Sequence, residues 1–256
     1  MIERFEDREA LARAVATLFA DQALKSVDVR GCFSVLLAGG ETPRRAYQLL
    51  AQEPYLGRIP WRDVHFFWGD ERCVPSDDPR SNQLMVRRAL LDHLPVFPDQ
   101  IHPIACNETP QQSADLYEAE LRGYFDNAPL TFDLALLGLG NDGHTASLFP
   151  GSAALTEHRR WTAVTHRAGE DFSRVTLTAP LLNQAALVLF MVTGSAKARV
   201  LKAIMGGGNE HPMLPAQLVR PLSGDLRWFV DREAAYMLNE MGDSDGDKVA
   251  GFRETV

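Results

Sequence analysis

Cysteines and long apolar runs are scarce in this 256-residue sequence. Its three cysteines, Cys32, Cys73 and Cys106, are an odd number without CxxC spacing, so we expect free thiols in a reducing cytosol. The apolar run 185–192 is far shorter than the ~20 residues of a membrane span. The first residues have neither the apolar core of a signal peptide nor the pattern of a transit peptide. We therefore expect a cytoplasmic protein that does not enter a membrane.

Positive charge is in deficit as well. The 26 lysines and arginines are outnumbered by 34 aspartates and glutamates, which gives a formal charge of −8. This balance argues against nucleic acid or an anionic membrane as a partner, and we see no DNA-binding helix-turn-helix segment. Any anionic ligand must be held by a local cluster of cations.

Several catalytic motifs are absent: GxSxG, HExxH, CxxC and the P-loop. The histidines other than His144 show no metal-ligand spacing, so we expect no metal. GLGNDG (138–143) satisfies GxGxxG after an expected strand, but Pro150 and Gly151 follow too soon for a Rossmann helix. The next expected strand also ends without a ribose-binding carboxylate, so we expect no dinucleotide cofactor.

The remaining pattern alternates short strands with amphipathic helices, and 45% of the residues are hydrophobic. Strands are expected at 33–38, 64–68, 132–140, 161–166, 174–179, 186–194 and 226–230. Helices are expected at 7–25, from Pro43 to about residue 52 with Thr42 as cap, at 81–94, around 114–124, from Ser195 onward and around 231–238. This order predicts an α/β fold with a largely parallel sheet flanked by helices. We expect one domain, 1–240, and a flexible tail, 241–256.

Unusual residues gather in four loops that follow expected strands: GGETPRR (39–45), GDERC (69–73), GLGNDGHTAS (138–147) and GSAK (194–197). In a parallel sheet such loops meet at one edge, where ligands bind. Gly39 and Gly40 allow a ligand to approach the backbone at a helix start, which suits an anion, and Arg44 and Arg45 add positive charge. An ordinary capped turn remains an alternative.

Two more cations fit such an anion site. Lys197 lies in the first turn of an expected helix, where a cation is unfavourable unless it faces an anion. Arg174 opens an expected strand. The alternatives are a solvated lysine and a surface charge at a strand end. Arg72 is also a candidate for binding phosphate, and Asp70 for orienting a base or binding sugar hydroxyls, although both could belong to a local ion pair.

Asp142 and His144 stand two residues apart in the glycine-rich turn. Histidine can accept and return a proton near neutral pH, and a neighbouring carboxylate can fix its tautomer. We therefore predict that His144 is a general base, with a structural histidine as the alternative. The N–H groups of the same loop are candidate oxyanion donors.

The segments GGETP, GDERCVP followed by SN (81–82), LGLGNDGHTASLFPG, RVTLTAPLLNQA and GSAK resemble the glucosamine-6-phosphate isomerase/6-phosphogluconolactonase family over residues 30–235. The resemblance implies a NagB/RpiA-like three-layer fold. It also implies hydrolysis of 6-phospho-D-glucono-1,5-lactone to 6-phosphogluconate in the oxidative pentose phosphate pathway, without metal or cofactor. The expected partner is this small sugar phosphate lactone, and we expect a monomer or a small homo-oligomer.

By this resemblance His144 is the general base, with Asp142 beside it. The positions that match phosphate-binding residues are Gly39, Gly40, Thr42, Arg174 and Lys197. The positions that match pocket-lining residues are Asp70, Arg72 and Asn82. One departure is Glu41, where the family commonly has serine. A carboxylate there must turn away from a phosphate or be offset by a nearby arginine.

Two alternatives remain open. Isomerases or deaminases that act on glucosamine 6-phosphate with this scaffold carry a glutamate five residues after the equivalent histidine, and here that residue is Phe149. The second alternative is a regulator that binds a sugar phosphate without catalysis. The presence of both Asp142 and His144 argues against it.

Overall fold

The computed structural model describes residues 1–106, 109–126, 128, 130–206 and 213–241. Its main sheet has seven strands, and every neighbouring pair is parallel. In spatial order these strands are β1 (Ile2–Phe5), β10 (Asp225–Asp231), β9 (Leu187–Val192), β6 (Leu134–Gly138), β2 (Phe33–Leu37), β3 (Val64–Trp68) and β5 (Ile101–His102). The predicted parallel sheet is confirmed, and β1 and β5 are additional strands.

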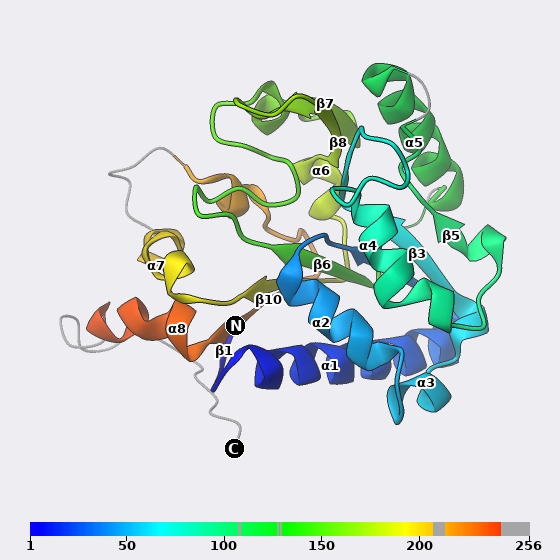
Figure 1. Cartoon of the computed structure of the whole chain (residues 1–256), viewed down its shortest axis with the longest axis horizontal. Coiled ribbons are helices and arrows are strands. Elements are labelled where there is room, and N and C mark those ends of the chain that lie inside the picture. Colours follow the sequence, from blue (N-terminus) through cyan, green and yellow to red (C-terminus); the bar gives the residue numbers. More distant parts are fainter. Residues whose placement is uncertain (107–108, 127, 129, 207–212, 242–256) are drawn as a thin grey trace.

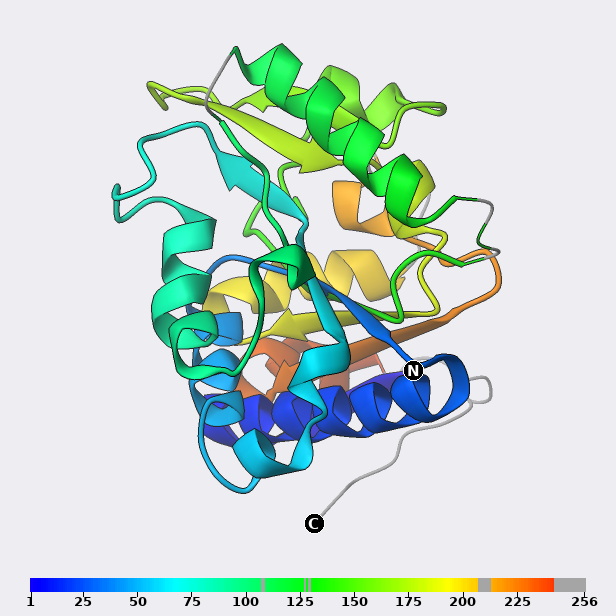
Figure 2. The same cartoon turned by 90° about the vertical axis from the view of Figure 1, so that its right-hand side faces the viewer.

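Helices and a second sheet cover the main sheet in layers (Figures 1 and 2). On one side α1 (Arg8–Arg30) packs on β2 and β10, and α2 (Glu41–Leu50) and α3 (Tyr55–Arg58) pack against α1. The opposite side carries α5 (Pro110–Tyr124) with the second sheet. Asp7 caps α1 by accepting a hydrogen bond from Ala10 N at 2.8 Å, and Gly31 ends it with φ of +76°. The helix therefore runs five residues beyond the predicted end.

The second sheet contains β4 (Asp70–Arg72), β8 (Ser173–Leu177) and β7 (Thr162–His166), and both of its pairings are antiparallel. The sequence predicted β7 and β8 as strands but did not separate them from the parallel sheet. Only residues 167–172 connect them, whereas a parallel pair needs a crossover of a dozen residues or more. The prediction missed β4, which carries Asp70 and Arg72 to the second sheet.

The other helices are short. They are α4 (Asn82–Ala89), α6 (Ala179–Leu182), α7 (Ala198–Gly206) and α8 (Arg232–Ala235). The 3₁₀ turns are η1 (Trp61–Asp63), η2 (Leu91–His93), η3 (Pro98–Gln100), η4 (Ala153–Thr156), η5 (Ser195–Lys197), η6 (Pro215–Leu218) and η7 (Tyr236–Met241). Two predicted helix starts were wrong. Gly40, with φ of +107°, is the N-cap of α2 in place of Thr42, and a 3₁₀ turn from Ser195 precedes α7.

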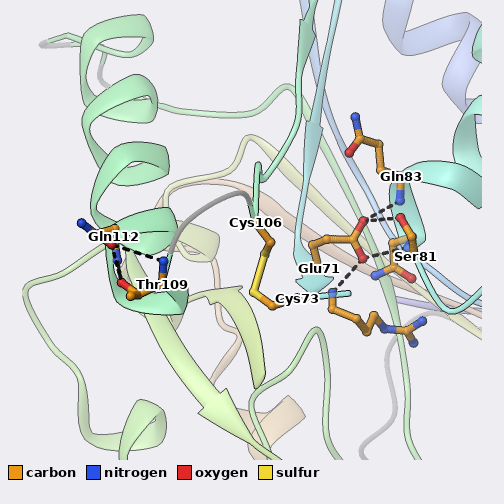
Figure 3. The surroundings of a disulfide bond; sticks show 9 residues. Glu71, Cys73, Ser81, Gln83, Cys106, Thr109 and Gln112 are labelled. Atoms are coloured by element: carbon orange, nitrogen blue, oxygen red, sulfur yellow. Dashed lines mark hydrogen bonds between the residues drawn. A yellow bond between two sulfur atoms is a disulfide. The ribbon is translucent and has the colours of Figure 1, made fainter. Parts of the chain in front are cut away.

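Cys73 and Cys106 form a disulfide, which corrects the prediction of free thiols for these two residues (Figure 3). They are 33 residues apart in the sequence, but their Cα atoms lie 5.1 Å apart because the end of β4 meets the segment before α5. This proximity arises only in the folded chain, so the spacing of the two cysteines in the sequence does not indicate the disulfide. Cys32 is a free thiol, as expected.

No helix in the described part of the chain is long and apolar enough to cross a membrane. The predicted tail, 241–256, lies outside the described residues except for Met241.

Candidate active site

A cavity of about 200 Å³ opens beyond the C-terminal ends of β2, β3 and β6. It is lined by Ala38, Gly39, Gly40, Asp70, Arg72, Asn82, Gly138, Leu139, Gly140, His144, Ala146 and Arg174. Most of these residues belong to loops that leave parallel strands, where such sheets bind ligands, and β8 adds Arg174. Three of the four predicted loops therefore meet at this cavity.

The turn after β6 brings Asp142 and His144 together. Gly140 N donates to His144 O at 2.8 Å, and Gly143 N donates to Gly140 O at 3.1 Å. Gly143 has φ of +80°, a conformation that favours glycine. A Cβ atom at Gly140 would lie 2.0 Å from His144 Nδ1, so no larger residue fits there. The N–H groups of these two glycines are used within the turn and are unsuited to binding an oxyanion.

His144 Nδ1 donates a hydrogen bond to Asp142 Oδ1 in the neutral tautomer that fits this pair. Nε2 then carries the lone pair, and the ring lies on the cavity wall. Burial lowers the pKa of His144 below its usual value, and Asp142 offsets part of that effect. Burial raises the pKa of Asp142, but the hydrogen bonds from His144 outweigh it and the pKa is lowered. At neutral pH the pair is a neutral imidazole beside a carboxylate.

Asp70 is a buried carboxylate that also lines the cavity. Its Oδ2 accepts a hydrogen bond from Ser147 Oγ at 2.5 Å, and Asn82 Nδ2 donates to its Oδ1 at 3.1 Å. Arg174 Nη1 lies 3.6 Å from Oδ2. These contacts fix Asp70, so it can orient a substrate hydroxyl without itself moving.

Arg174 is only 6% exposed and has Glu170 as its main partner. Its Nε and Nη2 donate to the two carboxylate oxygens at 2.9 and 2.7 Å, a bidentate pair. Burial raises the pKa of Glu170, but Arg174 outweighs this effect and the pKa is lowered. A phosphate group at Arg174 must therefore approach Nη1 or displace Glu170.

Arg72 and Asn82 complete the wall near Gly39. Arg72 Nη1 donates to the carbonyl of Arg80, while Arg72 Nε is buried without a hydrogen-bond partner among the described residues. A buried donor of this kind is normally satisfied, and a ligand oxygen in the cavity could accept its bond. A Cβ atom at Gly39 would lie 1.9 Å from Asn82 Oδ1, so glycine is required for this close approach.

Three predicted site residues do not line this cavity. Asp142 lies behind His144 and lines a neighbouring cavity with Ser195 and Arg199. Thr42 Oγ1 shares a hydrogen bond of 2.7 Å with Thr193 Oγ1, which ties the start of α2 to the end of β9. Lys197 is partly buried, and burial lowers its pKa while the charge of Asp142 opposes that effect.

The two arginines expected to add charge to the glycine loop have carboxylate partners. Arg45 binds Glu9 of α1 through Nε and Nη2 at 2.6 and 2.9 Å, away from the cavity wall. Arg44 Nη2 lies 2.7 Å from Glu41 Oε2. Neither arginine lines the cavity, so their contribution of charge to an anion site stays a prediction. Of the two alternatives predicted for the Glu41 carboxylate, its pair with Arg44 matches the second, a nearby arginine that offsets its charge.

Sequence reasoning missed several residues around the site. Ser147 and Glu170 bind Asp70 and Arg174, and Arg167 Nη2 lies 3.9 Å from Asp142 Oδ2. Ser147 ends the GLGNDGHTAS loop (138–147), but its partner Asp70 is 77 residues away. Glu170 lies in a hairpin loop, where spacing along the chain does not indicate contact. Among the described residues, no cluster of three or more histidines, cysteines, aspartates or glutamates is arranged to hold a metal.

Known proteins share this fold and this sequence pattern. The family model described as glucosamine-6-phosphate isomerases/6-phosphogluconolactonase matches residues 6–228. A protein of Synechocystis sp. named 6-phosphogluconolactonase is 38% identical over 89% of this chain and 94% of its own length. A solved structure named 6-phosphogluconolactonase from Trypanosoma cruzi has a TM-score of 0.82 at 32% identity and covers 93% of this chain and 96% of its own.

The architecture and the loop cluster define an α/β protein with the NagB-type fold. A monomeric glucosamine-6-phosphate deaminase of the NagB superfamily, 20% identical, shares that fold with a TM-score of 0.79 over 92% of this chain and 99% of its own. The chain belongs to the glucosamine-6-phosphate isomerase/6-phosphogluconolactonase family.

Proposed function

We propose that this chain hydrolyses 6-phospho-D-glucono-1,5-lactone to 6-phosphogluconate, with His144 as the general base. The observation that carries the proposal is the His144–Asp142 pair, whose Nδ1 hydrogen bond leaves Nε2 as the basic nitrogen at a cavity lined by glycines and arginines. The family membership and the relatives named 6-phosphogluconolactonase support the same reaction.

The reaction begins when a water molecule attacks the lactone carbonyl carbon. His144 Nε2 takes a proton from the water as the new C–O bond forms, and the carboxylate of Asp142 stabilises the imidazolium. The tetrahedral intermediate then breaks the bond between the carbonyl carbon and the ring oxygen. His144 returns its proton to that oxygen, which leaves a free acid and an unchanged enzyme. Every step uses only water and side chains of this chain, with no cofactor.

The phosphate group is distant from the reacting carbon and would hold the lactone in register. Its proposed contacts are the backbone of Gly39 and Gly40 at the start of α2, and the cations Arg174 and Lys197, with Thr42 fixing the helix start. No side chain caps α2, so its first N–H groups can face an anion. Asp70, Arg72 and Asn82 are proposed to bind the sugar hydroxyls and the carbonyl region.

The described part of the structure lacks the proton-transferring glutamate that the deaminase alternative needs beside the base. Phe149 occupies the position of the expected glutamate, and its ring centroid lies 4.8 Å from that of His144. The guanidinium groups of Arg167 and Arg174 each lie 5.4 Å from the centre of the same ring. Phe149 therefore packs against the ring of the base and offers no group for proton transfer during ring opening.

The proposal has a direct test. Fresh lactone is generated enzymatically, and acid release is followed with and without the protein. We expect release well above the spontaneous rate, and loss of about 10²- to 10⁴-fold in His144→Ala. Binding of 6-phosphogluconate without turnover would favour the regulator alternative, and turnover retained in His144→Ala would refute the assigned base.

Three broader features belong to the same proposal. We place the activity in the cytoplasm because of its phosphorylated sugar substrate, since the cysteine argument no longer applies to Cys73 and Cys106. Residues 1–240 are proposed to act as one domain with the tail 241–256 outside it. The assembly is proposed to be a monomer or a small homo-oligomer.

A further inference from the structure

Glu71 is almost completely buried between β4 and α4, with 3% of its surface exposed. Successive side chains of a strand point to opposite faces. Asp70 and Arg72 line the cavity, whereas Glu71 points away from it toward the start of α4 (Figure 3). The carboxylate therefore lies behind the cavity wall, where it cannot meet the substrate.

The carboxylate of Glu71 accepts four hydrogen bonds. Oε1 accepts from the backbone N–H groups of Arg72 at 2.7 Å and Asn82 at 2.8 Å. Oε2 accepts from Gln83 N at 2.7 Å and from Ser81 Oγ at 3.0 Å. An ionised carboxylate accepts at both oxygens, so it satisfies all four donors, while an amide in its place would turn a donor toward two of them.

We propose that Glu71 is a positioning residue that holds Arg72 and Asn82 in their substrate-binding arrangement. This inference rests on the proposed function, because it treats those two residues as substrate contacts. Glu71 joins the strand that carries Arg72 to the helix that begins with Asn82. Asn82 in turn donates to the backbone and side-chain oxygens of Asp70 at 2.9 and 3.1 Å and lies against Gly39. A shift of α4 would therefore move Asn82 and, through these contacts, disturb Asp70 and Gly39 as well.

The matched variant is Glu71→Gln, which keeps the size of the side chain and loses two acceptor sites. We expect KM for the lactone and Kd for 6-phosphogluconate each to rise about tenfold, with kcat changed less than threefold. A role limited to folding would lower the amount of active enzyme and hence the apparent kcat, and leave KM and Kd as they are. Circular dichroism confirms that the assayed variant is folded.

Ser81→Ala is the second variant, which decides the matter if Glu71→Gln does not fold. It removes one of the four donors to Glu71 and the N-cap of α4, since Ser81 Oγ also accepts from Leu84 N at 3.1 Å. We expect a rise of about twofold to threefold in KM and Kd. Thr109→Ala is its control. Thr109 caps α5 in the same way, by accepting from Gln112 N at 3.3 Å, and it lies at the start of α5, apart from Glu71 and Ser81 (Figure 3).

The outcomes separate the two proposals. Wild-type KM and Kd in Glu71→Gln, or in Ser81→Ala where the first variant does not fold, overturn the positioning role. An equal rise in Thr109→Ala also overturns it, because the effect would then follow from the loss of any helix cap. Absence of lactone hydrolysis in the wild type would refute the proposed function, and the Kd comparison would still decide the role of Glu71.

Discussion

Gly140 and His144 lie so close that a methyl group on Gly140 would be 2.0 Å from the imidazole Nδ1 and 2.2 Å from Cε1. The same methyl group would lie 2.7 Å from Asp142 Oδ1. The hydrogen bond that orients the proposed base therefore passes directly over a residue that has no side chain. This closeness makes glycine a requirement of the site.

Gly140→Ala should lower kcat/KM by at least about 100-fold, because the new Cβ forces His144 and Asp142 apart and removes the positioned base. Gly123→Ala is the matched control, since a Cβ atom there meets nothing within 4 Å and Gly123 lies in α5, outside the cavity lining. Its kcat/KM should stay within about threefold of the wild type. Steady-state lactone hydrolysis measures both, and equal activities would contradict the close packing.

The pH profile should report His144. The neutral imidazole is the active form, so kcat/KM should fall as the pH decreases through the pKa of His144, which burial holds below its usual value. Asp142 raises that pKa, so Asp142→Asn should shift the acidic limb to lower pH. It should also lower the plateau, because the imidazolium loses its carboxylate partner. An unshifted or raised limb in Asp142→Asn would contradict the coupling.

Lys197→Ala should raise KM for the phosphorylated lactone by about tenfold or more, because the phosphate dianion loses a partly buried cation near the start of α7. The unphosphorylated D-glucono-1,5-lactone should be hydrolysed equally by the variant and the wild type. Arg199→Ala is the control, since Arg199 lines the neighbouring cavity. Equal losses with both lactones would show that Lys197 does not act on the phosphate.

Cys106→Ser should lower the free energy of unfolding by about 3 kcal/mol, because the disulfide closes a loop of 33 residues in the unfolded chain. Chemical denaturation with and without a dithiol reductant measures the difference. The reductant should destabilise the wild type and leave Cys106→Ser unchanged. Cys32→Ser is the control for the loss of a thiol, and it should respond to the reductant as the wild type does.

Arg174→Met should destabilise the protein by about 2–4 kcal/mol, because Glu170 and the buried Asp70 lose their cation. Glu170→Gln should have a smaller effect on stability. If Glu170 competes with phosphate for the guanidinium, the second variant should also bind 6-phosphogluconate at least as tightly as the wild type. Urea denaturation and calorimetry provide the two measurements, and weaker binding in Glu170→Gln would show that the pair supports the phosphate site.

Local patterns predicted much of the fold. Strand β3 was predicted with its observed bounds and β2 to within one residue, because short apolar runs ended by turn residues carry their own signal. The turn with Asp142 and His144 was also readable, since its two hydrogen-bonded residues are neighbours in the chain. In contrast, β4 has only three residues, and its pairing with β8 spans about a hundred residues, which leaves no local pattern.

The sequence by itself determined the alternation of strands and helices, the loops that carry polar residues and the close pair of carboxylate and imidazole. These features depend on neighbours along the chain. Only the tertiary structure decided that β7 and β8 form a separate sheet, that Cys73 meets Cys106, that Arg45 binds Glu9 of α1, and that Glu71 accepts a hydrogen bond from Asn82 N. The physical reason is that burial, hydrogen bonding and ion pairing depend on distance in space, and the chain must fold before distant residues acquire their partners.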